Sequence, residues 1–125
     1  GGLAEMSIGD WEGQKFNRLQ SEQQLIERCT KDIHWCPPNG ESLAIVAQRM
    51  CDAIEQIKKS HSDGSTVLVV SHGAATAIAI ATLIHNDPCQ WGGYHFRNCS
   101  LTELTLKDGA NLGSFDDCSH LGMFG

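Results

Sequence analysis

Residues 66–80, TVLVVSHGAATAIAI, join an apolar run to a run of small residues. The apolar part is rich in β-branched residues and predicts a buried strand, and the part that follows predicts a helix. His72 and Gly73 lie at the junction, which places an imidazole at the carboxyl edge of a sheet. Ligands bind at that edge in open α/β sheets, and the N-terminus of a helix favours anions. We therefore predict that His72 faces a bound oxyanion and that Gly73 lets a phosphate-sized group approach the backbone.

Two other interpretations fit the same residues. A histidine at the end of a strand can be a boundary residue that serves only the fold. The run Val69–Gly73 also half matches the nucleophile elbow G-x-S-x-G of serine hydrolases. Val69 replaces the first glycine of that motif, and a β-branched residue fits badly in so strained a turn, which argues against a serine hydrolase.

Length and composition predict a single α/β domain over residues 1–125. The chain is too short for two comfortable domains, and 41% of its residues are hydrophobic, as expected of a globular protein with a sizeable core. Because no run of about 20 apolar residues occurs, we expect no membrane partner. The formal net charge of −6 at pH 7 argues against a nucleic-acid partner, which requires a clustered basic face.

The six cysteines are interpreted as reduced thiols. No C-x-x-C pair occurs, and the histidines lack the paired spacing with cysteine that zinc sites show. Because reduced thiols are typical of cytoplasmic proteins, the sequence predicts a cytoplasmic location and no metal site.

Hydrophobic periodicity predicts the other elements. Apolar residues recur at three- and four-residue steps over 43–59, which indicates a helix, and Glu41 is interpreted as part of its first turn, where the macrodipole favours a carboxylate. Period-two alternation over 100–106 and the turn signal after it predict a hairpin whose second strand lies in 111–115. The sequence also predicts a weak helix over 14–28, an apolar loop over 30–40 suited to covering a pocket, a strand over 66–71 and a helix over about 74–85.

Several motifs follow one another along the chain. They are L-x-E-x-x-x-G-x-W-E-G at 3–13, N-G-E-S-L at 39–43 followed by Arg49, the strand and histidine at 67–73, the strand at 98–104 and the tail at 116–121. Together they resemble the histidine phosphatase superfamily, also called the phosphoglycerate mutase-like family, and the resemblance covers nearly the whole chain. It implies a three-layer α/β/α fold of the phosphoglycerate mutase type.

The opening motif of that family, R-H-G on the first strand, does not occur in these residues. In the family this segment carries the histidine that attacks phosphorus and an arginine that binds phosphate. We therefore expect a fold without its opening strands, in which the strand at 66–71 has an unpaired side. Such an edge invites pairing, so the expected partners are a second copy of the chain or a segment that supplies the missing strands.

The resemblance implies hydrolysis of a small phosphorylated metabolite through a phosphohistidine intermediate, with no metal ion or other cofactor. In that reaction His72 and the helix N-terminus would bind phosphoryl oxygens, and Glu5 would protonate the leaving alcohol. A carboxyl group beside a bound phosphate can keep a proton because like-charge repulsion disfavours its anion. Trp35, in the 30–40 loop, would line the organic half of the substrate.

Two alternatives to a phosphatase stay open. The short segment between Gly13 and Gly40 favours a phosphatase, because mutases of this family usually carry longer insertions, but mutase-type phosphoryl transfer also fits the motifs. A catalytically inactive fragment or binding module fits as well, since the nucleophilic histidine is not among these residues. Turnover of a phosphomonoester distinguishes an enzyme from a binding module.

Overall fold

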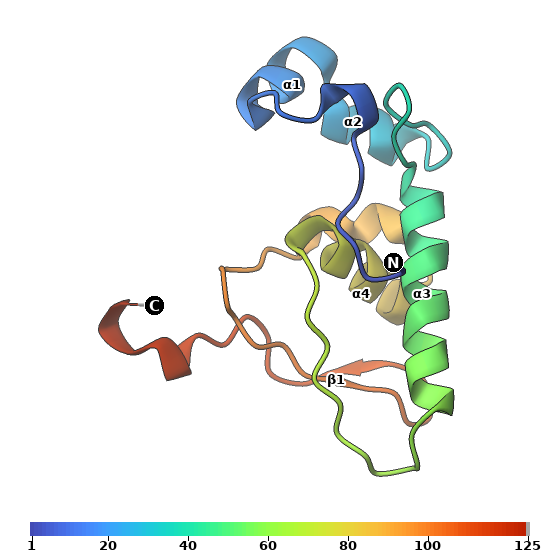
Figure 1. Ribbon diagram of the computed structural model, residues 1–125, viewed down its shortest axis with the longest axis vertical. Coiled ribbons are helices and arrows are strands. Elements are labelled where there is room, and N and C mark those ends of the chain that lie inside the picture. The colour runs from blue at the N-terminus through green and yellow to red at the C-terminus, as the bar shows by residue number, and fades with distance from the viewer. Residues whose placement is uncertain (125) are drawn as a thin grey trace.

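The computed structural model describes residues 1–124, and helices make up most of its regular structure (Figure 1). In chain order the elements are η1 (Gly9–Trp11), α1 (Phe16–Gln23), α2 (Leu25–Lys31), α3 (Leu43–Lys59), α4 (Gly73–His85), η2 (Pro88–Gly93), β1 (Leu104–Thr105), β2 (Asn111–Leu112) and η3 (Ser119–Phe124), where η denotes a 3-10 helix.

The predicted helices at 43–59 and 74–85 are confirmed as α3 and α4. Ser42 caps α3, because its hydroxyl oxygen accepts a hydrogen bond from the N–H of Ile45 at 3.2 Å. Lys58 and Lys59 occupy the last turn, where the helix dipole favours cations. Helix α3 therefore has local reasons to form before any tertiary contact is made.

The predicted single helix over 14–28 is wrong, because the chain forms two helices that break at Gln24. Gln24 has a left-handed backbone with φ 51°, and the side-chain oxygen of Gln20 accepts a hydrogen bond from the N–H of Ile26 at 3.1 Å just beyond the break. Leu19 and Leu25 are both buried, yet residues six apart point about 120° away from each other on a continuous helix. The break lets both leucines pack inward.

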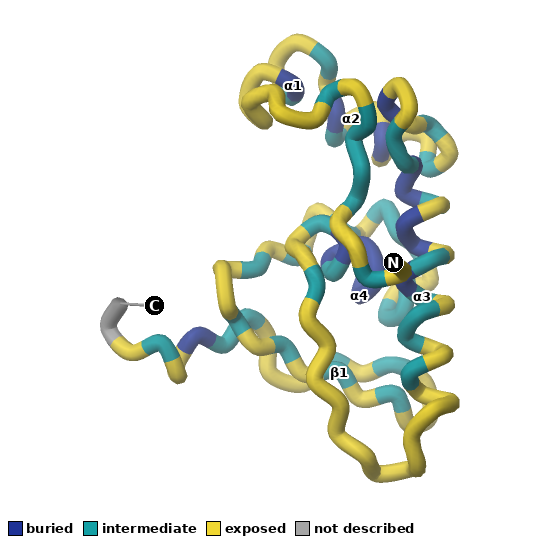
Figure 2. Tube along the Cα trace, viewed as in Figure 1, coloured by how far each residue is buried: buried dark blue, intermediate teal, exposed yellow. Residues whose placement is uncertain are grey.

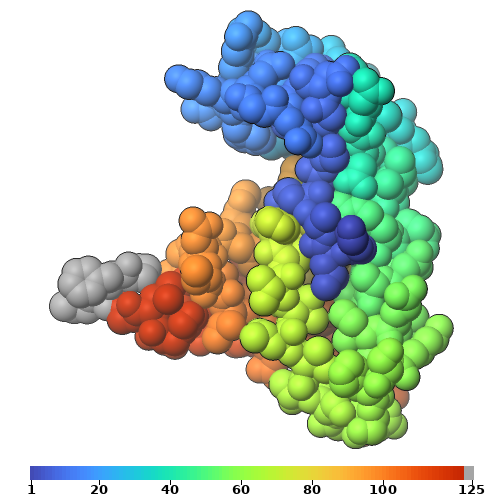
Figure 3. Space-filling model, in the orientation of Figure 1, coloured from blue at the N-terminus to red at the C-terminus, as the bar shows by residue number. Residues whose placement is uncertain are grey.

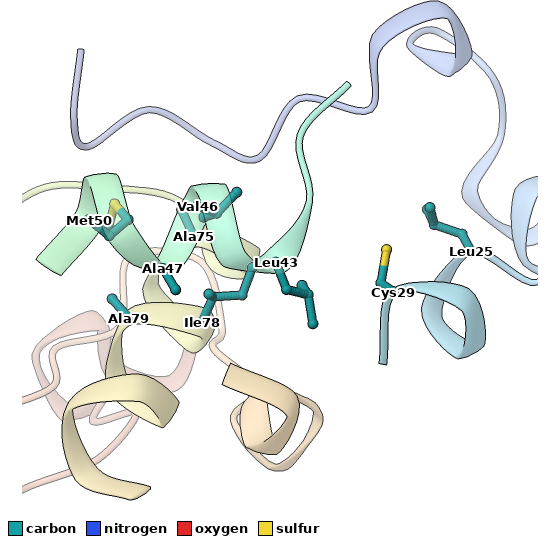
Figure 4. Packing of buried hydrophobic residues seen from close by; sticks show 9 residues of the cluster. All are labelled: Leu25, Cys29, Leu43, Val46, Ala47, Met50, Ala75, Ile78 and Ala79. Atoms are coloured by element: carbon teal, nitrogen blue, oxygen red, sulfur yellow. The ribbon is translucent and has the colours of Figure 1, made fainter. Parts of the chain in front are cut away.

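The core lies mainly between α3 and α4, as Figure 4 shows. Leu43, Val46, Ala47 and Met50 of α3 face the small side chains of α4, which lets the two helices approach closely. Leu25 and Cys29 of α2 extend the same cluster towards the N-terminal part of the chain. Burial raises the pKa of the Cys29 thiol to about 11, with a smaller contribution from Cys36.

The predicted buried strand at 66–71 is not observed. The segment is extended, but among residues 1–124 it pairs with no other strand, and Figure 2 shows it largely exposed. Leu68 and Val70 are 78% and 80% exposed, whereas Val67 and Val69 on the other side are 39% and 41% exposed. A strand needs a neighbouring strand to pair with its backbone and a packing partner to cover its side chains. The described residues supply no such neighbour for the exposed side of this segment.

The predicted hairpin near the C-terminal end is confirmed, although its strands are shorter than expected. β1 and β2 pair antiparallel with Leu104 opposite Leu112, and an isolated bridge joins Leu101 to Asp117. Asp108 and Gly109 have positive φ in the turn, as a tight hairpin requires. Within residues 1–124 this pair is the whole of the regular sheet, so the central layer of the predicted three-layer fold is not formed by the described residues alone.

The loop before α3 is held on η1 by hydrogen bonds and by a close approach to Gly9. The N–H of Asp10 donates to the carbonyl oxygen of Pro38 at 2.9 Å, and the amide of Asn39 donates to the carboxylate of Asp10 at 3.0 Å. Gly9 has φ 57°, and a β-carbon there would lie 2.2 Å from the Pro38 oxygen. The backbone of the loop therefore approaches Gly9 more closely than a side chain would allow.

None of the helices in residues 1–124 combines the length and the apolar character that a membrane crossing requires. All six cysteines are free thiols.

We expect the 125-residue chain to self-associate, because the exposed apolar edge at 66–71 can pair with a second copy. Replacing both Leu68 and Val70 with lysine places charge on that edge and should shift the chain to a monomer in size-exclusion chromatography with light scattering. Ile45→Lys is the control, because Ile45 is 50% exposed on α3, away from the edge. A parent chain that is monomeric and melts cooperatively would contradict this expectation.

Gly9→Ala should destabilise the chain by about 2 kcal/mol or more, through backbone strain and the clash with Pro38. Gly13→Ala is a matched control, because Gly13 also has positive φ (81°) but no atom lies within 4 Å of the position of its β-carbon. Urea unfolding followed by the fluorescence of Trp11 and Trp35 measures both variants. Equal losses of unfolding free energy would show that the contact with Pro38 costs nothing.

Candidate active site

Glu5 and His72 come together at the N-terminus of α4. His72 is the N-cap residue of that helix. The Glu5 carboxylate lies on the first turn, where Oε1 accepts a hydrogen bond from the N–H of Ala75 at 2.8 Å and Oε2 accepts one from Ala74 at 3.2 Å. A carboxylate is favoured there by both hydrogen bonding and the helix dipole. The structure therefore places two of the predicted site residues at one helix end, although they are far apart in the sequence.

The helix end is only partly open to another anion. We predicted that this helix N-terminus would bind phosphoryl oxygens, but Glu5 occupies the N–H groups of Ala74 and Ala75. The N–H of Gly73 makes no hydrogen bond within the described part of the chain, and no heavy atom lies within 4 Å of the position that a β-carbon on Gly73 would take. An incoming oxyanion therefore has room beside Gly73.

The His72 side chain does not serve the local fold. It makes no capping hydrogen bond to α4, and the residue is exposed, as is Gly73. A boundary histidine that serves only the fold would have a packing or hydrogen-bonding role among its neighbours. Such a role is not found in the described residues, so the imidazole is free to meet a ligand.

An ion pair between Glu41 and Arg49 supports the segment that carries Glu5. The guanidinium Nε lies 2.7 Å from Glu41 Oε1 and Nη2 lies 2.9 Å from Oε2, which makes the pair bidentate. The hydrogen bond from Arg49 lowers the pKa of the Glu41 carboxyl below its ordinary value, although burial opposes that shift. Glu41 thus does not lie in the first turn of a helix as predicted, because α3 begins at Leu43 and the carboxylate turns towards Arg49 instead.

A cavity of about 620 Å³ opens beside the N-terminus of α4. Glu5, Gly73 and Ala74 line one part of it, and most of the remaining lining is apolar. The main apolar side chains are Ile8, Phe16, Ile26, Trp91, Tyr94 and Phe96. In the space-filling view of Figure 3 the surface is hollowed between the blue α1–α2 part and the orange segment near residues 88–100. Among the described residues no Lys or Arg lines this cavity.

Trp35 does not line the cavity. Its ring packs against Trp11, with ring centroids 6.0 Å apart, and the guanidinium carbon of Arg28 lies 5.6 Å from its centroid. The 30–40 loop thus packs on η1 in the described structure and does not cover the pocket. The predicted contact between Trp35 and substrate stays a prediction. The cavity wall includes Trp91 and Tyr94 instead, which the sequence motifs did not single out.

Comparisons with known proteins show the family of the chain and its fold. The histidine phosphatase superfamily (branch 1) matches residues 1–113. A protein of Erwinia tasmaniensis named probable phosphoglycerate mutase GpmB is 28% identical over 127 residues, a match that includes 95% of this chain and 59% of that protein. The protein of the same name from Yersinia enterocolitica is 34% identical over 92 residues, which are 69% of this chain and 42% of that protein. The chain thus spans about three fifths or less of these relatives.

Two solved structures share the fold. Mycobacterial glucosyl-3-phosphoglycerate phosphatase, solved in complex with VO3, superposes with a TM-score of 0.76 at 24% identity, covering 92% of this chain and 60% of that one. A putative alpha-ribazole-5'-P phosphatase from Escherichia coli K-12 superposes with a TM-score of 0.72 at 24% identity, covering 93% and 58%. The predicted α/β fold of the phosphoglycerate mutase type is therefore confirmed. With its family match over residues 1–113, the chain belongs to the histidine phosphatase superfamily, branch 1.

Proposed function

We propose that residues 1–125 form part of the active site of a phosphatase that hydrolyses a small phosphomonoester through a phosphohistidine. The observation that carries this proposal is the position of the Glu5 carboxylate on the first turn of α4, beside the exposed His72. A proton donor, an imidazole and a helix N-terminus at one point are the groups that a departing alcohol and a charged phosphoryl group require.

In the proposed reaction, a histidine from outside these residues attacks phosphorus, since R-H-G does not occur here. The bond from phosphorus to the ester oxygen breaks as the bond from nitrogen to phosphorus forms, and Glu5 gives its proton to the departing oxygen. His72 and the N–H of Gly73 bind phosphoryl oxygens throughout. Water then attacks phosphorus and the bond from nitrogen to phosphorus breaks. Glu5 accepts a proton from that water, and inorganic phosphate and the free histidine result.

The two oxygens of Glu5 are not equivalent. Oε1 accepts hydrogen bonds from the N–H groups of Met6 and Ala75, both at 2.8 Å, whereas Oε2 has only the longer bond from Ala74. Protonation of Oε1 would disturb two good hydrogen bonds, and protonation of Oε2 disturbs one weak bond. Oε2 is therefore the oxygen that would carry the proton to the substrate.

The cavity favours a phosphatase over a mutase. A phosphoglycerate or a bisphosphate carries a second anionic group, and among the described lining residues His95 is the one basic side chain that could pair with it, with no Lys or Arg beside it. The apolar wall instead suits a substrate whose organic half is uncharged and partly apolar. The free thiols fit a reducing compartment, and the proposed location of the enzyme is accordingly the cytoplasm.

The isolated chain should not hydrolyse p-nitrophenyl phosphate, and a supplied R-H-G segment should restore turnover. In the restored enzyme His72→Ala should lower kcat by about 10²-fold or more, because a group that binds phosphoryl oxygens is lost. Glu5→Gln should slow the first step, release of the alcohol, by about 10²-fold or more for an alkyl phosphate but have little effect on the pre-steady-state release of p-nitrophenol, whose leaving group needs no proton.

Glu12→Gln is the matched control, because Glu12 is an exposed carboxylate of the same segment that bonds the Ser7 hydroxyl. Turnover by the isolated chain that disappears in His72→Ala would contradict the assignment of the nucleophile. Equal losses for both esters in Glu5→Gln would contradict the assignment of the acid.

The apolar wall should make 1-naphthyl phosphate bind at least about tenfold more tightly than glycerol phosphate, because the rings leave water on binding. Phe16→Ala should remove most of this difference without unfolding the chain, since Phe16 is 56% exposed. Ile45→Ala is the control, because Ile45 is a comparably exposed apolar residue (50%) that does not line the cavity. Calorimetric titration measures both ligands, and equal affinities in the parent would contradict an apolar subsite.

A further inference from the structure

Arg49 of α3 donates hydrogen bonds to backbone carbonyl groups just before Glu5 and at Glu5 itself. Its Nη1 donates to the carbonyl oxygens of Gly2 at 3.0 Å and Ala4 at 2.8 Å, and its Nη2 donates to that of Glu5 at 3.0 Å. The Arg49 side chain is 20% exposed, whereas Gly2, Ala4 and Glu5 are exposed residues. A single guanidinium thus holds the segment that carries the predicted acid.

Glu41 orients this guanidinium and also holds the far side of Glu5. Its carboxylate forms the bidentate pair with Arg49, and Oε2 accepts a further hydrogen bond from the N–H of Ser7 at 2.9 Å. The N–H of Glu41 donates to the carbonyl oxygen of Ser7 at 2.8 Å. The backbone is therefore held at residues 2–5 by Arg49 and at residue 7 by Glu41.

The side chain of Glu5 leaves the other face of this segment and ends on α4. Few other hydrogen bonds hold residues 1–4: the Ser71 hydroxyl donates to the carbonyl oxygen of Leu3 at 2.8 Å, and the N–H of Ala4 donates to Gly1. The place of the Glu5 carboxylate relative to the helix end thus depends on its backbone being held from α3. The contacts that hold this backbone are made by the ion pair of Arg49 and Glu41.

We infer that Arg49 and Glu41 are positioning residues, which keep the Glu5 carboxylate on the N–H groups of Ala74 and Ala75 and so keep Oε2 facing the site. The role of Glu5 as an acid rests on the proposed function, but its placement by this pair does not. Lysine cannot replace Arg49, because it lacks the planar fork that bonds Glu41 and three carbonyl groups together.

The test measures amide hydrogen exchange by NMR in the parent chain and in Arg49→Lys, which keeps the charge. The N–H of Ala75 should exchange about tenfold faster or more in the variant, because its charge-assisted bond to Glu5 is loosened. Amides in the interior of α4, such as that of Ile80, should exchange as in the parent. Glu41→Gln is a second variant with the same expectation, since it breaks the ion pair from the other partner.

Arg18→Lys is the matched control, because Arg18 pairs with Glu22 on α1 at 2.9 Å, away from the site. It should leave the exchange of Ala75 unchanged. Unaltered exchange at Ala75 in a folded Arg49→Lys chain would overturn the inference. Faster exchange throughout α3 and α4 in both site variants would also overturn it, since the pair would then hold the fold as a whole.

A second readout separates positioning from a merely structural role. In the enzyme restored with an R-H-G segment, Arg49→Lys should slow the pre-steady-state release of the alcohol about tenfold for an alkyl phosphate and leave that of p-nitrophenol nearly unchanged, because in this step only the alkyl ester needs the proton from Glu5. A merely structural loss would lower both rates equally. The exchange experiment involves no substrate, so the inference can fail while the phosphatase proposal stands, and the reverse is also true.

Discussion

The first turn of α4 leaves backbone N–H groups without partners inside the helix, and Glu5 supplies a carboxylate to two of them. This contact joins the N-terminal segment to a helix far along the chain and brings an acid to the residue that caps the helix. Without it, His72 would be an exposed imidazole beside an ordinary helix end. The chemical character of the site therefore depends on which residue occupies the positive end of α4.

The same contact creates a competition that suits phosphoryl chemistry. A phosphate bound beside Gly73 and the carboxylate of Glu5 would share one helix N-terminus, and two anions there repel each other. Protonation of Glu5 relieves the repulsion while one oxygen keeps its hydrogen bonds to Met6 and Ala75. In the proposed reaction, binding of the substrate would thus favour the form of Glu5 that gives its proton to the leaving alcohol.

Among the described residues, the helices have the backbone hydrogen bonds and packing neighbours that they need, whereas the extended segment lacks them. A helix bonds its own backbone, so α3 and α4 form and pack against each other with the neighbours they have. An extended segment cannot do so, and residues 66–71 expose Leu68 and Val70 although their sequence is that of a buried strand. The apolar character of this segment and its exposure together indicate a surface that needs another strand.

Local patterns were enough to predict α3, α4, the hairpin turn and the junction that carries His72, because periodicity, capping and turn residues act over a few neighbours. The family motifs also located Glu5. The tertiary contacts of the site and of the loops could not be predicted from local patterns. The ion pair of Glu41 with Arg49 and the packing of Trp35 on Trp11 join segments whose relative placement only the tertiary structure decides, since side-chain contacts depend on how separate elements pack.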